Sequence, residues 1–508
     1  NAGAVRQDAC RRRARGGRGR GAAEVCPPSC GFRTASRLAF LERTARLNAS
    51  GGCILTLRTI LKQPDWLKRC AGHPLAKRAL GPPFQQPQRS RIEAMNAIAQ
   101  HFGAIQTAVQ TQNGSQLAQL LSCLAPSTPL PPQVAGVVQN AQYAEDCAKH
   151  YCGEPWGPIA AKQTCARVAL DRGETKKAYD AVVSAYNGFL NAIREEGGWV
   201  APLIRTLTFE ARVIAERADS EVSKRAKAAN AHVAKPNETL RDVEKTLKKG
   251  FSACWTDRTG GPPGASKKRA TLYVVSQLMK IYFKLNLLKL AQPLIRPVEA
   301  SAGKALESNS VFPVGDVVSY RFFVGRLRMF EDRYEEAEAH LAYAFAHCRT
   351  TSRSNKRAIL EFLLPVRLRS GRFPHPKLLE KHGLASMLPL VQAVKVGDLR
   401  TFNNELKRHQ RALVKKGTFL LLEQSKILVY RNLFKKVFLV NEKQTQVKLQ
   451  LFERALQCLG EPTDLAEVEC VVANLIYRGY VKGYISHQKA VLVVSKKDPF
   501  PTAAVMKR

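Results

Sequence analysis

Apolar residues recur at helical spacing along most of the chain from Met95 onward. One clear stripe runs through Val274, Leu278, Ile281 and Leu285. Intervals of three and four residues place these side chains on one face of an α-helix. The helical segments are short and are separated by turns that contain Gly, Asp or Pro. This pattern predicts an array of antiparallel helical hairpins.

Two of these hairpins share the same spacing of small residues. Each has one small residue on its first helix, and a small, a larger apolar and a second small residue on its second helix. The two sets are Gly325 with Ala337, Leu341 and Ala344, and Ala166 with Ala178, Val182 and Ala185. Small residues let two helices approach closely, as in tetratricopeptide-like repeats. A turn at Gly397-Asp398, with Asp398 as N-cap, fits the same plan. The sequence predicts an all-α, TPR-like solenoid.

The pattern changes after about residue 415. Helical periodicity predicts three helices, over Phe419–Leu439, Val447–Leu459 and Asp464–Tyr477. Two runs rich in β-branched residues follow, Val481–Ser486 and Val491–Ser495, and the four residues between them predict a β-hairpin. Three helices followed by a hairpin form a winged helix. We therefore expect a basic extension over 1–94, helical repeats over 95–265 and 266–415, a winged helix over 416–501 and a tail over 502–508.

The charge of the chain points to polyanionic partners. Eighty Lys and Arg stand against 41 Asp and Glu, which gives a net charge of +39. Such an excess favours nucleic acid, an anionic membrane surface or a strongly acidic protein. No apolar run is long enough to span a bilayer, so we expect no membrane insertion.

The segment before the first Met, Met95, allows three interpretations. It contains RRRARGGRGRG at Arg11–Gly21. Upstream non-coding sequence read in frame would have this composition, because GC-rich codons encode Arg, Ala, Gly and Pro. An Arg-rich transit peptide and a native RNA-binding tail are the alternatives. We expect a non-native or disordered extension; the remainder still holds 61 basic and 36 acidic residues.

Three C-terminal motifs resemble the family of PCI domain-containing protein 2. They are YRNLFKK at Tyr430–Lys436, ANLIYRGYVKGYISHQ at Ala473–Gln488 and VVSKKDPFP at Val493–Pro501. The likeness continues upstream to the region after Met95. It implies a PCI domain in which the repeats over 266–415 lead into the winged helix.

The resemblance also implies a function. Such a protein is a non-enzymatic scaffold subunit of a nuclear-pore-associated, transcription-coupled mRNA export complex. Its implied partners are a large helical scaffold of the GANP/Sac type and a small acidic protein of the DSS/Sem type. The implied location is the nucleus, at or near nuclear pores, with a cytoplasmic pool also compatible. The alternative is a purely structural PCI subunit of a signalosome, proteasome-lid or initiation-factor-type assembly. The basic composition independently suits an acidic partner.

The predicted winged helix is basic outside its third helix. Asp464, Glu467 and Glu469 at the start of that helix disfavour base reading in the major groove. The candidate nucleic-acid-binding residues are Arg431, Lys435, Lys436, Arg478, Lys482, His487, Lys489, Lys496 and Lys497. With Tyr480 and Tyr484 as stacking faces, they predict weakly selective binding to single-stranded RNA, with DNA as a further candidate. The alternatives are a solvated surface with both tyrosines in the core, or a protein-docking face.

No catalytic motif is evident in the sequence. A Walker loop, GxGxxG after a strand, HExxH and GxSxG are all missing. Cys147, His150 and Cys152 lack a second ligand pair at zinc-site spacing. We therefore expect no catalytic residues, no metal and no cofactor, and reduced cysteines after Met95. The basic triplet Lys267–Arg269 is read as a solvated helix start in preference to a nuclear-import signal.

Overall fold

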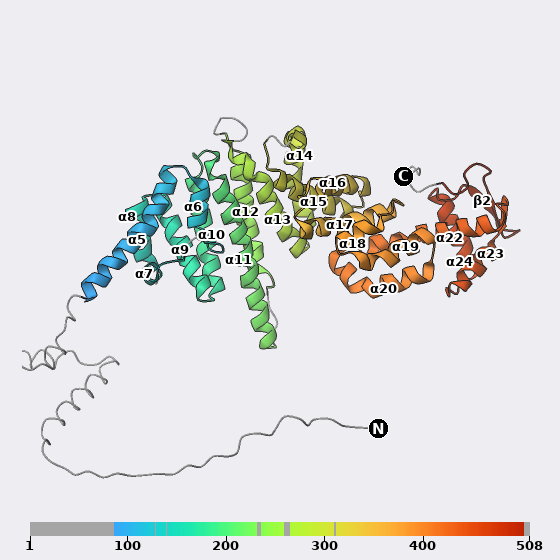
Figure 1. Cartoon of the computed structure of the whole chain (residues 1–508), viewed down its shortest axis with the longest axis horizontal. Coiled ribbons are helices and arrows are strands. Elements are labelled where there is room, and N and C mark those ends of the chain that lie inside the picture. The colour runs from blue at the N-terminus through green and yellow to red at the C-terminus, as the bar shows by residue number, and fades with distance from the viewer. Residues whose placement is uncertain are drawn as a thin grey trace, which may run out of the picture. The chain divides into compact units, whose positions relative to one another are not determined.

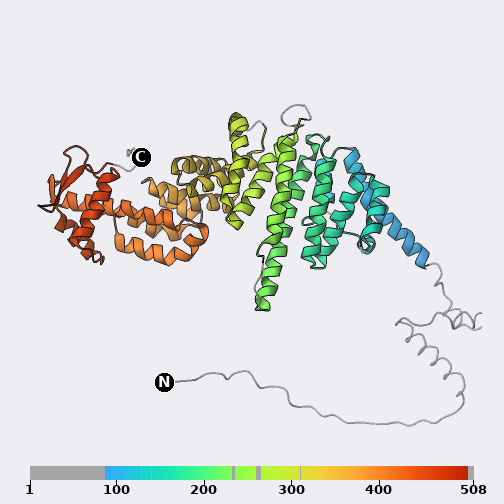
Figure 2. The same cartoon turned by 180° about the vertical axis from the view of Figure 1, so that it is seen from behind.

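The computed structural model describes residues 86–126, 129–138, 140–230, 235–258, 265–308 and 311–501, with only the backbone course for 86–92 and 301–308. The described residues from Arg89 onward belong to one compact unit, which is built mainly of α-helices (Figure 1). The same helices are seen from behind in Figure 2. The predictions for residues 1–85 and for the tail 502–508 lie outside the described residues.

The first part of the helical array confirms the expected hairpins. Each helix from α8 (Ala141–Cys152) to α12 (Glu238–Trp255) packs against the next one along the chain. The first helix already begins at Gln86, ahead of Met95. The helices are α5 (Gln86–Gln110), α6 (Gly114–Leu120), α7 (Pro132–Val137), α8 (Ala141–Cys152), α9 (Trp156–Asp171), α10 (Thr175–Ala192), α11 (Ala201–Ala228), α12 (Glu238–Trp255) and α13 (Thr271–Leu285).

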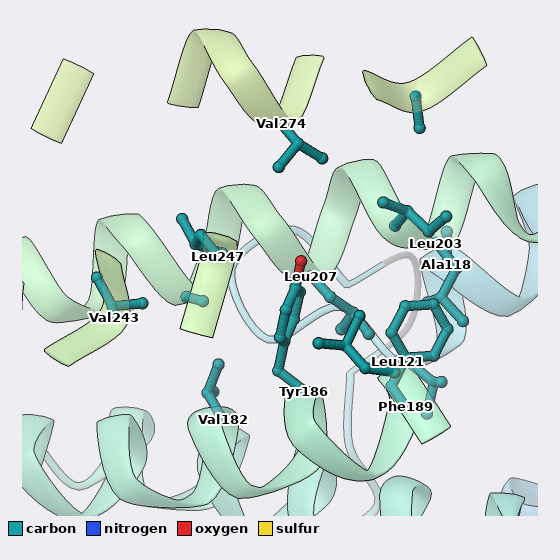
Figure 3. Packing of buried hydrophobic residues seen from close by; sticks show 14 of the residues in the cluster. Ala118, Leu121, Val182, Tyr186, Phe189, Leu203, Leu207, Val243, Leu247 and Val274 are labelled. Carbon is teal, nitrogen blue, oxygen red and sulfur yellow. The ribbon is translucent and has the colours of Figure 1, made fainter. Parts of the chain in front are cut away.

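Tyr186 on α10 lies near the middle of the core of this part. Figure 3 shows it among Val182, Leu207 and Leu247, so that three helices meet around one ring. Its hydroxyl forms a 3.0 Å hydrogen bond with the hydroxyl of Thr208. Because Tyr186 is completely buried, this bond satisfies a phenol that would otherwise be desolvated without a partner.

The second part of the array contains the other predicted hairpin. Gly325 on α15 allows a close helix crossing, because a Cβ there would lie 2.8 Å from Cγ of Leu341 on α16. Asp398 caps α20 by accepting from the backbone N–H of Thr401 at 3.0 Å. The helices are α14 (Gln292–Ser308), α15 (Val314–Phe330), α16 (Tyr334–His347), α17 (Arg353–Arg369), α18 (Pro376–Lys381), α19 (Leu388–Val396) and α20 (Leu399–Lys416).

The shared register is confirmed in both hairpins. The small and apolar residues on the second helices are fully buried. They are Ala178, Val182, Ala185, Ala337, Leu341 and Ala344. Ala166 on α9 is fully buried as well. Close helix crossings therefore occur where the spacing of small residues predicts them.

The C-terminal part is a winged helix, as predicted, with two local differences. The first predicted helix is divided at Ser425, whose hydroxyl donates to the carbonyl of Leu421. Val447, predicted as helical, lies in a strand and is buried opposite Leu492. The elements are α21 (Phe419–Gln424), α22 (Lys426–Val440), β1 (Gln446–Lys448), α23 (Leu449–Cys458), α24 (Leu465–Tyr477), β2 (Gly483–Ser486) and β3 (Val491–Val494). The strands form an antiparallel sheet in the order β1-β3-β2.

The buried apolar residues form two large clusters that meet on α15. One extends from Ile98 to Leu327, and the other from Met329 to Phe500. The winged helix shares the second cluster with α16, α17, α19 and α20. Residue 415 therefore marks a change of architecture within a continuous core.

Lys267, in the basic triplet, belongs to the interior. Its ammonium lies 3.3 Å from a carboxylate oxygen of Asp257 and donates to the carbonyls of Ile193 and Arg194. Lys268 and Arg269 are exposed. The triplet forms a short 3₁₀ segment, Lys267–Ala270, that leads into α13, so it is a helix start as predicted. The prediction that this start is solvated is wrong for Lys267, whose ammonium is buried by its pairing with Asp257.

Candidate nucleic-acid interface in the winged helix

The hairpin separates the predicted lysines into two groups. Lys482 precedes β2 and Lys496 follows β3, so both lie at the open end of the hairpin. Lys489 lies in the connecting turn at the opposite end. Each strand has four residues, which places the two ends about 13 Å apart. The predicted lysines therefore lie in two groups, one at each end of the hairpin.

Backbone hydrogen bonds hold three lysines at the open end. The carbonyl of Lys482 accepts from the N–H of Ser495 at 2.8 Å, and the N–H of Lys482 donates to the carbonyl of Pro499 at 2.9 Å. The hydroxyl of Ser495 accepts from the N–H of Lys497 at 3.2 Å. We call Lys482, Lys496 and Lys497 the strand-end cluster. All three are exposed, and none forms an ion pair with a described residue.

Lys443 adds a fourth cation at this end, which the sequence interpretation missed. The N–H of Val494 donates to the carbonyl of Thr445 at 2.8 Å, so the chain before β1 runs alongside the end of β3. Lys443 lies two residues before Thr445 and is exposed. Its position depends on the pairing of β1 with β3, and no local pattern indicated that pairing.

The turn end of the hairpin is less positive. Lys448 on β1 pairs in register with Val491, next to the turn that carries Lys489. His487 in the same turn lies 2.8 Å from the carboxylate of Glu469 on α24. Sequence distance had hidden this contact. The Glu469 carboxylate opposes phosphate binding at the turn, as Asp498 does beside Lys497 at the open end, where more lysines surround it.

Arg431 lies in the interior of the winged helix, so its prediction as a nucleic-acid contact is wrong. Its guanidinium is buried and donates to the carbonyls of Phe500 at 2.7 Å and Pro501 at 2.6 Å. Burial lowers the pKa of this group. Arg431 lies three residues before Phe434 and seven before Phe438, on the buried face of α22. That spacing was the signal that could have placed it inside.

The remaining predicted residues differ in accessibility. Lys436 and Arg478 are exposed, whereas Lys435 is half-buried. Tyr480 is buried and belongs to the core of the wing, in agreement with the alternative interpretation of that residue. Tyr484 is 64% exposed and can offer a ring face. Tyr477 on α24, which was not predicted, is 89% exposed.

The Asp464 carboxylate caps α24. It accepts from the backbone N–H of Glu467 at 2.7 Å, so this helix begins with two acidic side chains that are both exposed. Carboxylates at a helix N-terminus would face DNA phosphates in a major-groove complex. The geometry therefore agrees with the expectation that α24 does not read bases.

The described residues hold neither a metal centre nor a membrane-spanning helix. Within the described ranges, no group of three or more His, Cys, Asp and Glu side chains could hold a metal ion. Cys152 is buried, with its thiol near the carbonyl of Phe102. All described cysteines are free thiols. None of the helices described is long and apolar enough to cross a bilayer.

Comparison with known proteins decides the family. The model of the PCI domain matches residues 406–496. The chain is similar to PCI domain-containing protein 2 of Xenopus laevis, with 35% identity over 409 residues that cover 80% of this chain and 97% of the relative. The chain belongs to the PCI domain-containing protein 2 family. It is also 41% identical over 333 residues to the Dictyostelium discoideum homologue, covering 64% of this chain and 74% of that protein.

The PCI family includes proteins with other names. A protein named Protein CSN12 homolog from Mycosarcoma maydis is 33% identical over 356 residues, covering 65% of this chain and 75% of its own length. PCI-domain proteins are generally non-catalytic scaffold subunits. The matched PCI region ends at Lys496 and so includes the sheet and most of the strand-end cluster.

Proposed function

We propose that this PCI protein is a non-enzymatic scaffold subunit of a nuclear-pore-associated, transcription-coupled mRNA export complex. In this role it contacts the RNA backbone through the strand-end cluster. The observation that carries the RNA contact is the grouping of Lys482, Lys496 and Lys497, exposed and without ion pairs among the described residues. Its similarity to a PCI domain-containing protein 2 over 97% of that protein's length supports the scaffold role.

The proposed assembly has two protein partners. A large helical scaffold of the GANP/Sac type and a small acidic protein of the DSS/Sem type are those that the family resemblance implies. The excess of basic residues supports the acidic partner, because opposite charge accelerates association and disfavours wrong partners. The proposed location is the nucleus, at or near nuclear pores.

The RNA contact is electrostatic in this proposal. Each lysine that neutralises a phosphate releases condensed counterions, so the logarithm of the affinity falls with the logarithm of the salt concentration. Phosphate contacts carry no sequence information. The exposed ring of Tyr484 adds a stacking face, which tolerates any base. Weak sequence selectivity follows from both contacts.

The two ends of the hairpin provide the test and its control. The test variant is Lys482→Gln with Lys496→Gln, and the matched control is Lys448→Gln with Lys489→Gln. RNA affinity of the partner-bound complex is measured as a function of salt, using two unrelated single-stranded sequences. The slope of log affinity against log salt concentration should become smaller by about 1.4 in the test variant, at roughly 0.7 per lost phosphate contact. In the control it should change much less. Subunit co-elution should survive in both. Equal slopes in all three proteins would place the RNA-binding surface elsewhere.

A second candidate function uses the wing for subunit contact only. It is a structural role in a signalosome, proteasome-lid or initiation-factor-type assembly. Tyr477 and Tyr484 favour it, because large exposed rings are typical anchors of protein interfaces. In this case Tyr477→Ser with Tyr484→Ser would abolish subunit co-elution, and the lysine variants would leave RNA affinity unchanged.

A further inference from the structure

Arg326 on α15 lies against aromatic rings from two other helices. Its guanidinium carbon is 4.0 Å from the ring centre of Phe283 on α13 and 4.3 Å from that of Phe362 on α17. A third ring, that of Phe322, lies 5.6 Å away. The guanidinium forms no hydrogen bond or ion pair with any described residue, and its Nε is buried without a partner.

Two arginines that are buried more fully than the half-buried Arg326 have acceptors. Arg328, two residues further along α15, is paired with Glu299, Glu331 and Glu336. Arg431 donates to two backbone carbonyls. A desolvated cation without an acceptor is costly, and aromatic rings offset only part of that cost. Among the described residues, the Arg326 guanidinium is therefore left without an acceptor.

The acidic residue next to Phe362 on α17 does not form an ion pair with Arg326. Glu361, which precedes Phe362, is held by Lys416 at 2.9 Å and by Arg357 at 3.4 Å. When an aromatic ring stacks on a face of a guanidinium, the in-plane N–H donors stay directed away from the ring. A planar carboxylate can accept from two of these donors at once.

The surroundings favour a peptide as the occupant. Phe330, one turn after Arg326, is 39% exposed, and its ring centre lies 6.1 Å from that of Phe283. A single cation among aromatic rings is complementary to a peptide in which one carboxylate stands beside an apolar side chain. A nucleic-acid backbone instead requires several cations along its path, as at the strand-end cluster.

We infer that Arg326, Phe283, Phe362 and Phe330 form a docking site for an acidic peptide segment of a partner protein. An Asp or Glu carboxylate binds the in-plane donors of Arg326, and an adjacent apolar side chain packs on Phe330. This inference rests on the part of the proposed function that gives the chain an acidic protein partner. It adds the site that receives that partner.

The test uses the full chain and a fluorescent peptide of about eight residues, in which Phe-Leu is flanked by Asp and Glu. A second peptide carries Asn and Gln in place of the acids. We expect the acidic peptide to bind, and Arg326→Met to weaken it about 10- to 100-fold, the loss expected for hydrogen bonds to a charged group. Arg321→Met is the control, because Arg321 lies on the same helix over the ring of Tyr343 but has His340 as a partner.

A stability measurement separates recognition from folding. Met matches the length of the Arg stem and removes the unpaired charge, so the Tm of Arg326→Met should stay within a few degrees of the wild type or rise. A larger fall in Tm would overturn the inference, because the arginine would then be a structural element. So would equal binding of both peptides, no binding of the acidic peptide, or unchanged binding by Arg326→Met.

An RNA arm distinguishes the two classes of ligand. If single-stranded oligouridylate displaces the peptide and Arg326→Met weakens its binding, the site takes phosphate and the inference fails. The salt slopes of the wing variants are measured separately. If the peptide test at Arg326 fails while the Lys482 and Lys496 variant still lowers the salt slope of RNA binding, the RNA part of the proposed function stands. If the wing variants leave that slope unchanged, only the RNA part is lost.

Discussion

Charged side chains are used differently in the helical repeats and in the winged helix. Between residues 149 and 416, Lys and Arg repeatedly pair with Asp and Glu, and the Lys267–Asp257 pair is almost completely buried. Among the described residues after Ser425, the one ion pair is between His487 and Glu469, and no Lys or Arg forms an ion pair there. Internal pairing stabilises the repeats, whereas the winged helix leaves its cations available to a polyanion.

The largest effect should follow from breaking a buried pair in the repeats. Lys267→Met removes the ammonium from Asp257 and from two backbone carbonyls. We expect a loss of about 3–5 kcal/mol in the free energy of unfolding, because an uncompensated buried charge remains. Urea unfolding measures it, and the exposed neighbour Lys268→Met is the control. Equal stability of the two variants would show that buried pairs do not support the repeats.

The pH dependence of stability sharpens the comparison through His340, a half-buried histidine of the repeats. Burial, followed by the charges of Arg321, Arg328 and Arg333, lowers the pKa of His340 to about 4. On acidification, His340 is protonated near pH 6.5 in the unfolded state but only near pH 4 in the folded state. Stability from this group is therefore complete above pH 6.5 and is lost as the pH falls toward 4.

The matched variants isolate that contribution. Between pH 7 and pH 4, the wild type should lose about 2–3 kcal/mol more unfolding free energy than His340→Gln. Parallel curves for the wild type and His340→Gln would contradict the assignment.

Arg431 is the internal exception within the winged helix. Arg431→Met should lower the free energy of unfolding by about 2 kcal/mol, because the carbonyls of Phe500 and Pro501 lose a charged donor. The slope of RNA affinity against salt should stay as in the wild type. A reduced slope with unchanged stability would return Arg431 to the nucleic-acid interface.

The smallest effect concerns the helix crossing in the repeats. Gly325→Ala should cost roughly 1–2 kcal/mol of unfolding free energy, because the new methyl would meet Leu341. Gly315→Ala on the same helix has open space around its Cβ and should be neutral or stabilising. Thermal unfolding of both variants checks the pair, and equal Tm values would show that α15 and α16 can separate at little cost.

Local patterns predicted the features that arise within one or two neighbouring helices. The hairpin register at Ala178 and Val182 followed from 3.6-residue periodicity, and the cap at Asp398 from a single turn. The same periodicity indicated that Arg431 is internal, but its positive charge had placed it among the predicted surface cations.

Local sequence patterns could not predict contacts between segments that lie far apart in the chain. β1 has three residues, too few for an alternating pattern, and its partner β3 lies more than 40 residues later. The position of Lys443 depends on that pairing. The rings around Arg326 come from α13 and α17, so only the assembled array brings them together.

The central position of β3 has a consequence for biosynthesis. Translation delivers β1 and then β2, but neither is paired with the other in the final sheet. Both must wait for β3, the strand made last of the three, before their backbone groups are satisfied. On the ribosome the repeats can therefore fold ahead of the sheet. The strand-end cluster takes its final form only once β3 has emerged.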